Sequence, residues 1–291
     1  MEIQSGTLYV VGTPIGNLED MTFRAVQVLQ QVTAIAAEDT RHTGKLLQHF
    51  QITTPQVSYH EHNRVARLPE LLQRLQRGEA LALVTDAGMP GISDPGYELV
   101  SACITAGIDV VPIPAATAAT TALIASGLPT DRFIFEGFLP TKASLRQERL
   151  DALQMDPRTV ILYEAPHRVL ETLQDLAQSF GGDRPVVLAR ELTKRYEEFW
   201  RGTLTDAIAH YQTHAPQGEF TMVVGGACLA QPVLSEDALK AELQALLRQG
   251  ISRSQASRQL AHQTSLSRRQ LYQLALAIPD SQSPLDEAGV L

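Results

Sequence analysis

Short, wholly apolar runs recur through the first 128 residues, and segments with helical periodicity separate them. The runs lie at residues 8–11, 34–37, 80–84 and 110–113. A strand that is apolar on both faces must be covered on both faces, which is typical of a parallel sheet with helices on either side. We therefore predict an N-terminal αβ domain over residues 1–128, in which Thr22 caps the first helix and Phe23, Val26 and Leu29 form its buried face.

Residues 129–228 repeat this alternation and predict a second αβ domain. Apolar strands are expected near 133–135, 160–163, 186–188 and 220–224, with helices near 143–154 and 167–180. Residues 197–202 alternate between polar and apolar side chains, which favours an antiparallel, half-exposed strand. The second sheet is therefore expected to be mixed.

The chain changes character after Gly225-Gly226. Leucines at helical spacing predict a compact helical module over residues 233–279, followed by a disordered tail at 280–291. Residues 243–279 contain five arginines and no Asp or Glu, whereas the whole chain has a net charge of -8. Those arginines are Arg248, Arg253, Arg258, Arg268 and Arg269. They suit either RNA phosphates or a solvated helical face, and the residues alone favour neither.

Composition restricts the compartment and the general class of protein. The apolar content of 44% suits a folded globular chain, and no apolar run approaches the roughly 18 residues of a membrane-spanning helix. The N-terminus has no secretory signal pattern. Cys103 and Cys228 both lie in apolar surroundings, so we expect buried thiols rather than a disulfide. A cytoplasmic protein without a membrane partner is the expectation.

Ligands of open parallel sheets bind beyond the carboxyl ends of the strands. Residues 86–96 follow such a strand, contain three glycines and two prolines, and have no Lys or Arg. This composition predicts a rigid loop whose backbone approaches a nucleoside-like ligand closely. Residues 12–17 follow the first strand but match neither the Walker nor the dinucleotide-binding glycine pattern.

Two polar clusters also follow strands and supply candidates for acid-base chemistry. Glu38 and Asp39 precede Thr40-Arg41-His42, where Asp39 could instead cap the next helix and Arg41 form a surface ion pair. His60 and His62 would share one face of an extended segment, but no further ligands at metal-site spacing accompany them. The candidate bases are therefore Glu38, Asp39, His60 and His62, and no metal is expected.

Eight ordered blocks of sequence resemble one family. They are Gly12-Thr-Pro-Ile-Gly-Asn-Leu18, residues 36–43, His60-Glu-His-Asn63, Asp86-Ala-Gly with Ile92-Ser-Asp-Pro-Gly-Tyr97, Ser126-Gly-Leu-Pro129, Glu136-Gly-Phe-Leu-Pro140, Tyr163-Glu with Pro166-His-Arg168, and Ala189-Arg-Glu-Leu-Thr-Lys194. Together the blocks resemble the bacterial 16S rRNA cytidine 2′-O-methyltransferases of the tetrapyrrole methylase superfamily. The resemblance covers roughly residues 7–276.

The resemblance implies two αβ domains with S-adenosylmethionine between them, a homodimer, and methylation of the 2′-hydroxyl of cytidine 1402 in 16S rRNA of the small ribosomal subunit. The implied donor-binding residues are Asp86, Gly88, Met89, Ile92, Ser93, Thr117, Ala118, Tyr163 and Ala189. The residues implied to face the nucleotide are Glu38, Asp39, Arg41, His60, His62, Asn63, Arg168 and Lys194, with Arg253, Arg258, Arg268 and Arg269 on the RNA.

The sequence also departs from the family pattern. Pro114-Ala115-Ala116-Thr117 replaces the usual Pro-Gly-Pro followed by Ser or Cys, and Met89 and Ala165 replace Thr and Ser. Three alternatives remain at this point: a small-molecule tetrapyrrole methylase, a DNA-binding regulator and a metal hydrolase. The basic C-terminal module and the loop at 60–63 have no evident use in a small-molecule methylase. A DNA-binding regulator would not need the Gly- and Pro-rich loops of two αβ domains, and a metal hydrolase would require a bound metal ion.

Overall fold

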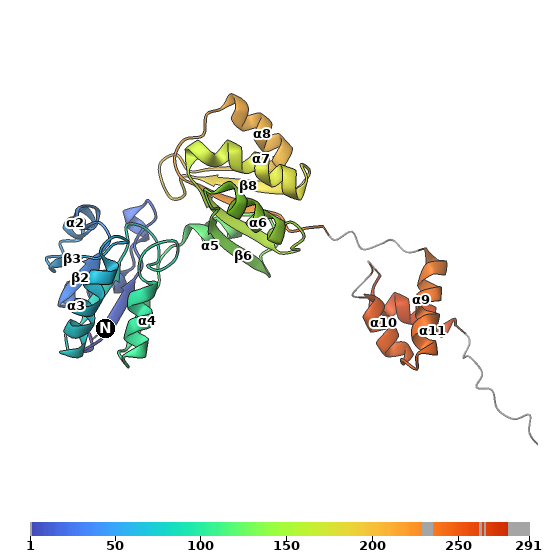
Figure 1. Ribbon diagram of the computed structural model, residues 1–291, viewed down its shortest axis with the longest axis horizontal. Helices are drawn as coiled ribbons and strands as arrows, with labels where there is room; N and C mark the ends of the chain where they lie inside the picture. The colour runs from blue at the N-terminus through green and yellow to red at the C-terminus, as the bar shows by residue number, and fades with distance from the viewer. Residues whose placement is uncertain (1, 229–234, 262–263, 265, 279–291) are drawn as a thin grey trace, which may run out of the picture. The chain divides into compact units, whose positions relative to one another are not determined.

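The computed structural model describes residues 2–228, 235–261, 264 and 266–278. The chain divides into two compact units, residues 1–227 and residues 228–291 (Figure 1). The first unit contains two five-stranded sheets flanked by helices, and the second unit is helical. The α/β fold class and the C-terminal helical module are thereby confirmed.

The first sheet is parallel throughout, as predicted, with the strand order β3-β2-β4-β1-β5. Its strands are β1 (Leu8–Val11), β2 (Ala34–Ala37), β3 (Gln56–Ser58), β4 (Leu81–Val84) and β5 (Val110–Ile113). Successive side chains of β1 enter opposite cores: Tyr9 packs with α1 and α2, and Leu8 packs with α3 and α4. The helices are η1 (Leu18–Asp20), α1 (Phe23–Gln31), α2 (Thr40–His49), α3 (Arg64–Gln76) and α4 (Tyr97–Thr105).

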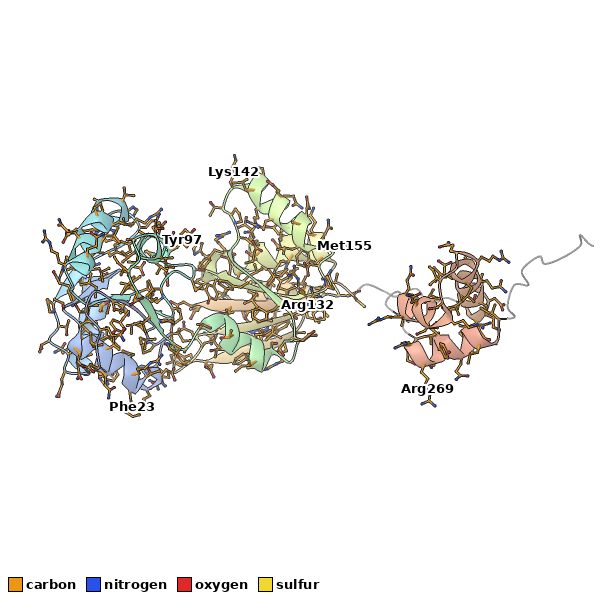
Figure 2. All side chains as sticks on the ribbon, turned by 90° about the horizontal axis from the view of Figure 1, so that it is seen from below. Phe23, Tyr97, Arg132, Lys142, Met155 and Arg269 are labelled. Carbon is orange, nitrogen blue, oxygen red and sulfur yellow. The ribbon has the colours of Figure 1, made fainter. Side chains whose placement is uncertain are left out.

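Helix α1 begins where predicted but buries a different face. The Thr22 side chain accepts a hydrogen bond from Ala25 N at 3.1 Å, as an N-cap should. Phe23, however, is 91% exposed and projects from the surface (Figure 2), while Ala25, Val28 and Leu29 are buried. An α-helix has 3.6 residues per turn, so residues spaced by three drift around its axis. Phe23, Val26 and Leu29 therefore do not all share one face.

The second sheet is mixed, as predicted, with the order β6-β7-β10-β8-β9. Only β6 and β7 pair in parallel. The strands are β6 (Phe133–Phe138), β7 (Thr159–Glu164), β8 (Pro185–Arg190), β9 (Glu198–Thr203) and β10 (Phe220–Val224). The helices are α6 (Ala143–Leu153), η2 (Pro166–Arg168), α7 (Val169–Phe180) and α8 (Leu204–Thr213). Helix α8 was not predicted, although Thr203 and Asp206 form a capping box at its start.

Helix α5 (Ala118–Ser126) connects the two halves of the first unit. It follows β5 of the first sheet but packs its small side chains against the second sheet, with Ala122 and Leu123 beside Ile161 and Val223. Alanines allow the helix to approach the strands closely, and this brings the start of α5 to the site described below. The domain boundary at residues 128/129 stays a prediction.

Among its described residues, the second unit contains three helices, α9 (Glu236–Arg248), α10 (Arg253–Ala261) and α11 (Arg268–Leu276). Leu239, Leu243, Leu260 and Leu271 form its core. The predicted tail at 280–291 lies outside the described residues. Within the described chain, no helix is both long and apolar enough to cross a membrane.

The two cysteines differ in their surroundings. Cys103 is buried against the first sheet, as predicted. The expectation of a buried Cys228 was wrong, because this thiol is exposed. Cys228 lies beyond the end of β10, where no sheet covers it, so an apolar local sequence does not ensure burial there.

Candidate active site

A cavity of about 340 Å³ lies where both halves of the first unit contribute residues. Its walls come from the loop after β4, the start of α5, and the strands β7, β8 and β10. The volume falls within the range of small-molecule sites. Eight of the nine predicted donor-binding residues line it: Gly88, Met89, Ile92, Ser93, Thr117, Ala118, Tyr163 and Ala189.

The loop after β4 is held in conformations that few residues other than glycine adopt. Gly88 and Gly91 have φ angles of +76° and +84°. Gly88 also pairs with Thr13 of the β1 loop: Thr13 N donates to Gly88 O at 2.9 Å, and Gly88 N donates to Thr13 O at 3.1 Å. This paired backbone makes one wall of the cavity rigid, as the composition predicted.

Two of the departures from the family pattern pack around Gly12. A Cβ at Gly12 would collide with the Met89 sulfur and would lie 2.6 Å from the Ala115 methyl group. Met89 and Ala115 therefore fill the space beside β1 that the absent side chain leaves. The resulting contact constrains the turn through side-chain packing, where the family pattern uses glycine and proline.

Tyr163 joins the second sheet to the start of α5. Its hydroxyl oxygen accepts a hydrogen bond from Ala119 N at 3.2 Å, and its ring lies edge-on to Phe135 and Phe138. Burial raises the pKa of the Tyr163 phenol, so the group is neutral and polar at physiological pH. The contact fixes the position of Thr117 and Ala118 at the cavity edge.

The cavity walls are apolar with an acidic component. Ile15, Ile92 and Leu192 contribute apolar surface, and Asp94 contributes a carboxyl group. Glu164 and Glu219 also line the cavity, but the buried Glu164 carboxylate accepts from Thr172 Oγ1 at 2.6 Å and the Glu219 carboxylate pairs with Lys194. No lysine or arginine lines the cavity within the described part of the chain. A partly buried site with a carboxyl group that no lining cation pairs favours a ligand that carries positive charge.

Asp94 is the most perturbed of these carboxyl groups. Burial, and then the nearby Glu38 carboxylate, raise the pKa of Asp94 to about 6. Burial likewise raises the pKa of Glu38, which lies close to Asp86 and His60. The sequence analysis did not select Asp94, even though the block Ile92-Ser-Asp-Pro-Gly contains it.

Comparison with known proteins identifies the family. The family model "Tetrapyrrole (Corrin/Porphyrin) Methylases" matches residues 7–208. This chain belongs to the tetrapyrrole methylase family. It is 62% identical to the ribosomal RNA small subunit methyltransferase I of Synechocystis sp., over 94% of this chain and 98% of that relative. It is 46% identical to the protein of the same name from Escherichia coli O157:H7, over 93% of this chain and 95% of that relative. The chain is therefore a methyltransferase.

Solved structures support the fold of this tetrapyrrole methylase. The uroporphyrin-III-C-methyltransferase of Thermus thermophilus matches with a TM-score of 0.55 and 23% identity, over 76% of this chain and 94% of that one. A cobalt precorrin-4 methyltransferase matches with a TM-score of 0.58 and 17% identity, over 76% and 95%. At these identities the likeness concerns the fold alone.

The cluster after β2 in this tetrapyrrole methylase has a clear structural role. The Asp39 side chain caps α2 by accepting from Arg41 N at 2.8 Å, and it forms an ion pair with the exposed Arg41 guanidinium at 2.7 Å. These hydrogen bonds from Arg41 hold the pKa of Asp39 well below its usual range, so Asp39 is a weak base. Of the two carboxyl groups predicted here, Glu38 is the better proton acceptor.

The segment with His60 and His62 leads into a turn at residues 61–63, so the shared face that an extended segment would give does not form. Asn63 closes this turn, because its Oδ1 accepts from His60 N at 2.8 Å. The two imidazole rings are 6.0 Å apart; His62 is exposed and His60 half-buried. His60 Nδ1 is buried without a hydrogen-bond partner. No group of three His, Cys, Asp or Glu side chains in the described residues is placed to hold a metal ion.

Two basic residues predicted to face the nucleotide are paired with carboxylates of the protein. Arg168 donates to Leu139 O at 3.0 Å, and its guanidinium lies 3.5 Å from the buried Glu164 carboxylate. Lys194 Nζ lies 2.9 Å from carboxylate oxygens of both Glu191 and Glu219. Both cations thus offset carboxylates that line or adjoin the donor cavity, which is a structural role.

The remaining predicted residues are dispersed. Asp86 lines a neighbouring cavity and not the one that contains the other donor-binding candidates. In the second unit, Arg253 donates to Ala275 O and Ile278 O at the end of α11, and Arg268 donates to Ser254 Oγ. Arg258 and Arg269 are exposed, and Arg269 projects away from the helices (Figure 2).

Gly16 of the β1 loop lies against residues 192–194 of the second half. A Cβ at this position would lie 2.5 Å from Lys194 Cγ and 3.1 Å from Leu192 O. We expect Gly16→Ala to lower the free energy of unfolding by about 1–3 kcal/mol, because backbone atoms would have to move. Chemical denaturation measures this. Gly44→Ala in helix α2 is the matched control, since a Cβ there would make only an ordinary contact with Gln56 Nε2 at 3.6 Å and the change should be neutral or stabilising.

Proposed function

We propose that this chain transfers the methyl group of S-adenosylmethionine to the ribose 2′-hydroxyl of a cytidine in 16S ribosomal RNA, at position 1402. The observation that carries the proposal is the largely apolar cavity, which contains the Asp94 carboxyl group and, among the described residues, is lined by no lysine or arginine. Relatives with 46–62% identity over nearly the whole chain are named ribosomal RNA small subunit methyltransferase I, which supports the RNA substrate.

The residues present fit the donor. S-adenosylmethionine carries positively charged groups, which suit the Asp94 carboxyl group, and an adenine ring, which suits the apolar side chains. The Gly88 backbone supplies polar groups around the donor. Thr117 and Ala118, at the start of α5, supply small side chains that pack close to the donor. When bound, the donor supplies a methyl group on a positively charged sulfur, which is already activated toward a nucleophile.

Asp94 is the proton acceptor for the ribose hydroxyl in this proposal. It lines the donor cavity, and its carboxylate lies near that of Glu38, whose charge makes Asp94 a stronger base. A carboxyl group with a pKa near the working pH is efficient in this role and contributes about 10²–10⁴-fold to the rate. The rigid loop after β4 holds the acceptor oxygen in line, and such orientation contributes up to roughly 7–11 kcal/mol.

Methyl transfer to a defined RNA tests the function directly. The substrate is undermodified small-subunit RNA, free and within ribosomal particles, with labelled S-adenosylmethionine. We expect one methyl group per RNA, located by nucleoside mass spectrometry on the cytidine ribose. An otherwise identical RNA with a 2′-deoxycytidine at the target should accept none. Label on the base, or label on the deoxy substrate, would contradict the proposal.

The exposed arginines of the second unit are expected to contact RNA phosphates. Arg258 and Arg269 have no partner among the described residues, in contrast to Arg253 and Arg268. The double variant Arg258→Ala/Arg269→Ala should lower the slope of log affinity against log salt concentration by about 2, because each lost contact removes about 1. Filter binding at several salt concentrations measures the slope. An unchanged slope would show that Arg258 and Arg269 lie on a solvated face and do not contact RNA. Arg253→Ala, in contrast, should destabilise the second unit.

The RNA function also sets the expected partners and compartment. The small ribosomal subunit or its RNA is the proposed partner, and the cytoplasm the proposed location. A homodimer is proposed as well, and large exposed apolar side chains such as Phe23, Tyr97 and Ile124 suit a protein interface. Sedimentation of the full chain at micromolar concentration distinguishes the dimer from the monomer.

A further inference from the structure

A second cavity of about 270 Å³ lies beside the donor cavity. Helix α2 contributes His42, Lys45 and Leu46 to its walls, the β1 loop contributes Thr13 and Leu18, and Asp86 lies at the end of β4. The donor does not need this space, because the other eight donor-binding candidates line the first cavity. The second cavity therefore requires a different occupant.

The two cavities share one wall. Thr13 lines the second cavity and Gly88 the first, and their backbones are joined by hydrogen bonds of 2.9 and 3.1 Å. The buried Thr13 hydroxyl donates to Thr85 O at 3.1 Å and holds the same wall from the side. The positions of the two cavities relative to each other are therefore fixed by backbone pairing, which favours two parts of one reaction over two unrelated sites.

A line of carboxylates connects the cavities. Asp86 lines the second cavity, and its backbone N donates to Glu38 Oε2 at 3.4 Å. Glu38 and Asp86 both act electrostatically on Asp94, which lines the donor cavity. A molecule with its ring in the second cavity and its sugar beside Glu38 would thus present a sugar hydroxyl to Asp94.

The groups of the second cavity match a nucleotide. Pro14, Leu18 and Leu46 offer apolar surface to a planar ring. His42 and Lys45 are exposed at its edge, and among residues 2–228 neither side chain has a hydrogen-bond or ion-pair partner. Such basic side chains suit the phosphates that flank a nucleotide.

Asp86 gives the cavity a means of selecting the base. A carboxylate accepts from the exocyclic amino group of cytosine. Uracil presents a carbonyl oxygen at the same place, which would face the carboxylate without a proton between them. The second cavity therefore favours cytosine over uracil through a single side chain.

We infer that the second cavity holds the cytosine base of the acceptor nucleotide, turned out of its stack, with Asp86 accepting from the amino group. The inference rests on the proposed function, since it describes how the acceptor of that reaction binds. It also reassigns Asp86 from the donor to the nucleotide. Enzymes that modify one nucleotide commonly turn it out of the stack to reach the reacting atom.

The decisive experiment changes Asp86 and the target base together. Two RNAs that differ only in cytidine or uridine at the target are compared by kcat/KM. We expect the wild-type chain to prefer cytidine by about 10- to 100-fold. Asp86→Asn should lose or invert this preference, because its amide can donate to the uracil carbonyl. The dissociation constant for S-adenosylmethionine should stay within a few-fold, because Asp86 does not line the donor cavity.

A change on the RNA makes the test independent of how the variant folds. The wild-type chain with 2-pyrimidinone at the target, which is cytosine without its amino group, should lose about tenfold or more in kcat/KM. Lys45→Ala should raise the KM for RNA without changing the base preference, and Lys142→Ala, on the other half of the unit (Figure 2), is the matched control.

The outcomes separate the inference from the function. An Asp86→Asn chain that keeps its preference for cytidine, or a wild-type chain that methylates both RNAs equally well, overturns the base pocket and leaves the methyl transfer standing. Loss of donor binding in Asp86→Asn also overturns it, because Asp86 would then belong to the donor site. A wild-type chain that methylates neither RNA overturns the proposed function itself.

Discussion

The Asp94→Asn chain is expected to lose about 10²–10⁴-fold in kcat for methyl transfer. The amide keeps the size of the side chain and cannot accept the proton of the ribose hydroxyl. Rapid-quench measurement of a single turnover isolates the chemical step. Asp109→Asn is the matched control, because Asp109 is exposed and has no side-chain partner among the described residues, and it should retain normal turnover.

The pH dependence distinguishes a proton acceptor from a structural residue. The groups that act on Asp94 are the Glu38 and Asp86 carboxylates and the Thr85 hydroxyl, and Asp94 in turn acts on the Tyr163 phenol. The wild-type rate should fall about tenfold per pH unit below a pKa of about 6, because Asp94 becomes protonated there. Affinity for the cationic donor should decline over the same range. Asp94→Asn should show neither dependence.

Stability should change in the opposite direction to activity. The pKa of Asp94 is raised in the folded chain, so its contribution to stability is present at low pH and is lost as the pH rises through about 6. At pH 7, the free energy of unfolding of Asp94→Asn should therefore exceed that of the wild-type chain by on the order of 1 kcal/mol. A variant that is inactive because it is poorly folded would show the reverse, and a variant with a normal rate would remove Asp94 from the mechanism.

Ala118→Phe is expected to weaken binding of S-adenosylmethionine by about 10- to 100-fold, because the new ring would occupy the donor cavity. Ala118 lies at the start of α5, whose position the hydrogen bond between Ala119 N and the Tyr163 hydroxyl fixes. The helix therefore has little freedom to move away from the ring. Isothermal calorimetry on ligand-stripped protein gives the affinity without dependence on turnover.

Ala125→Phe provides the control for this substitution. It makes the same change on the same helix at an exposed position, so donor affinity should be unchanged. RNA affinity should be normal in both variants, since neither residue lines the second cavity or lies in the second unit. Normal donor binding by Ala118→Phe would place the donor elsewhere and would remove the main support for the proposed function.

Local sequence was sufficient to predict most strands and helices of this chain. An apolar run such as Leu81–Val84 has to be buried on both faces, and caps such as Thr22 mark where a helix begins. Eight of the nine donor-binding candidates line one cavity because they lie in loops and strand ends that the fold brings together. The face that α1 buries was missed, since the 3.6-residue period leaves adjacent faces ambiguous in a nine-residue helix.

Charge pairing could not be read from the chain. Arg168 and Lys194 look like substrate contacts in the sequence, but Glu164, Glu191 and Glu219 surround them in the structure. Arg253 similarly binds carbonyl oxygens at the end of α11. The sequence tells that a residue is a lysine or an arginine. Which carboxylate or carbonyl oxygen it pairs with depends on the segments that fold beside it.

The sequence by itself determined the α/β class, the rigid loop after β4 and the residues available for chemistry, because backbone preference and apolar periodicity act between near neighbours. Only the tertiary structure decided that α5 covers the second sheet, that Asp94 is desolvated beside Glu38, and that Asp86 enters a separate cavity. Each of these depends on contacts between residues far apart in the chain. Burial and electrostatic coupling arise from such contacts and have no local signal.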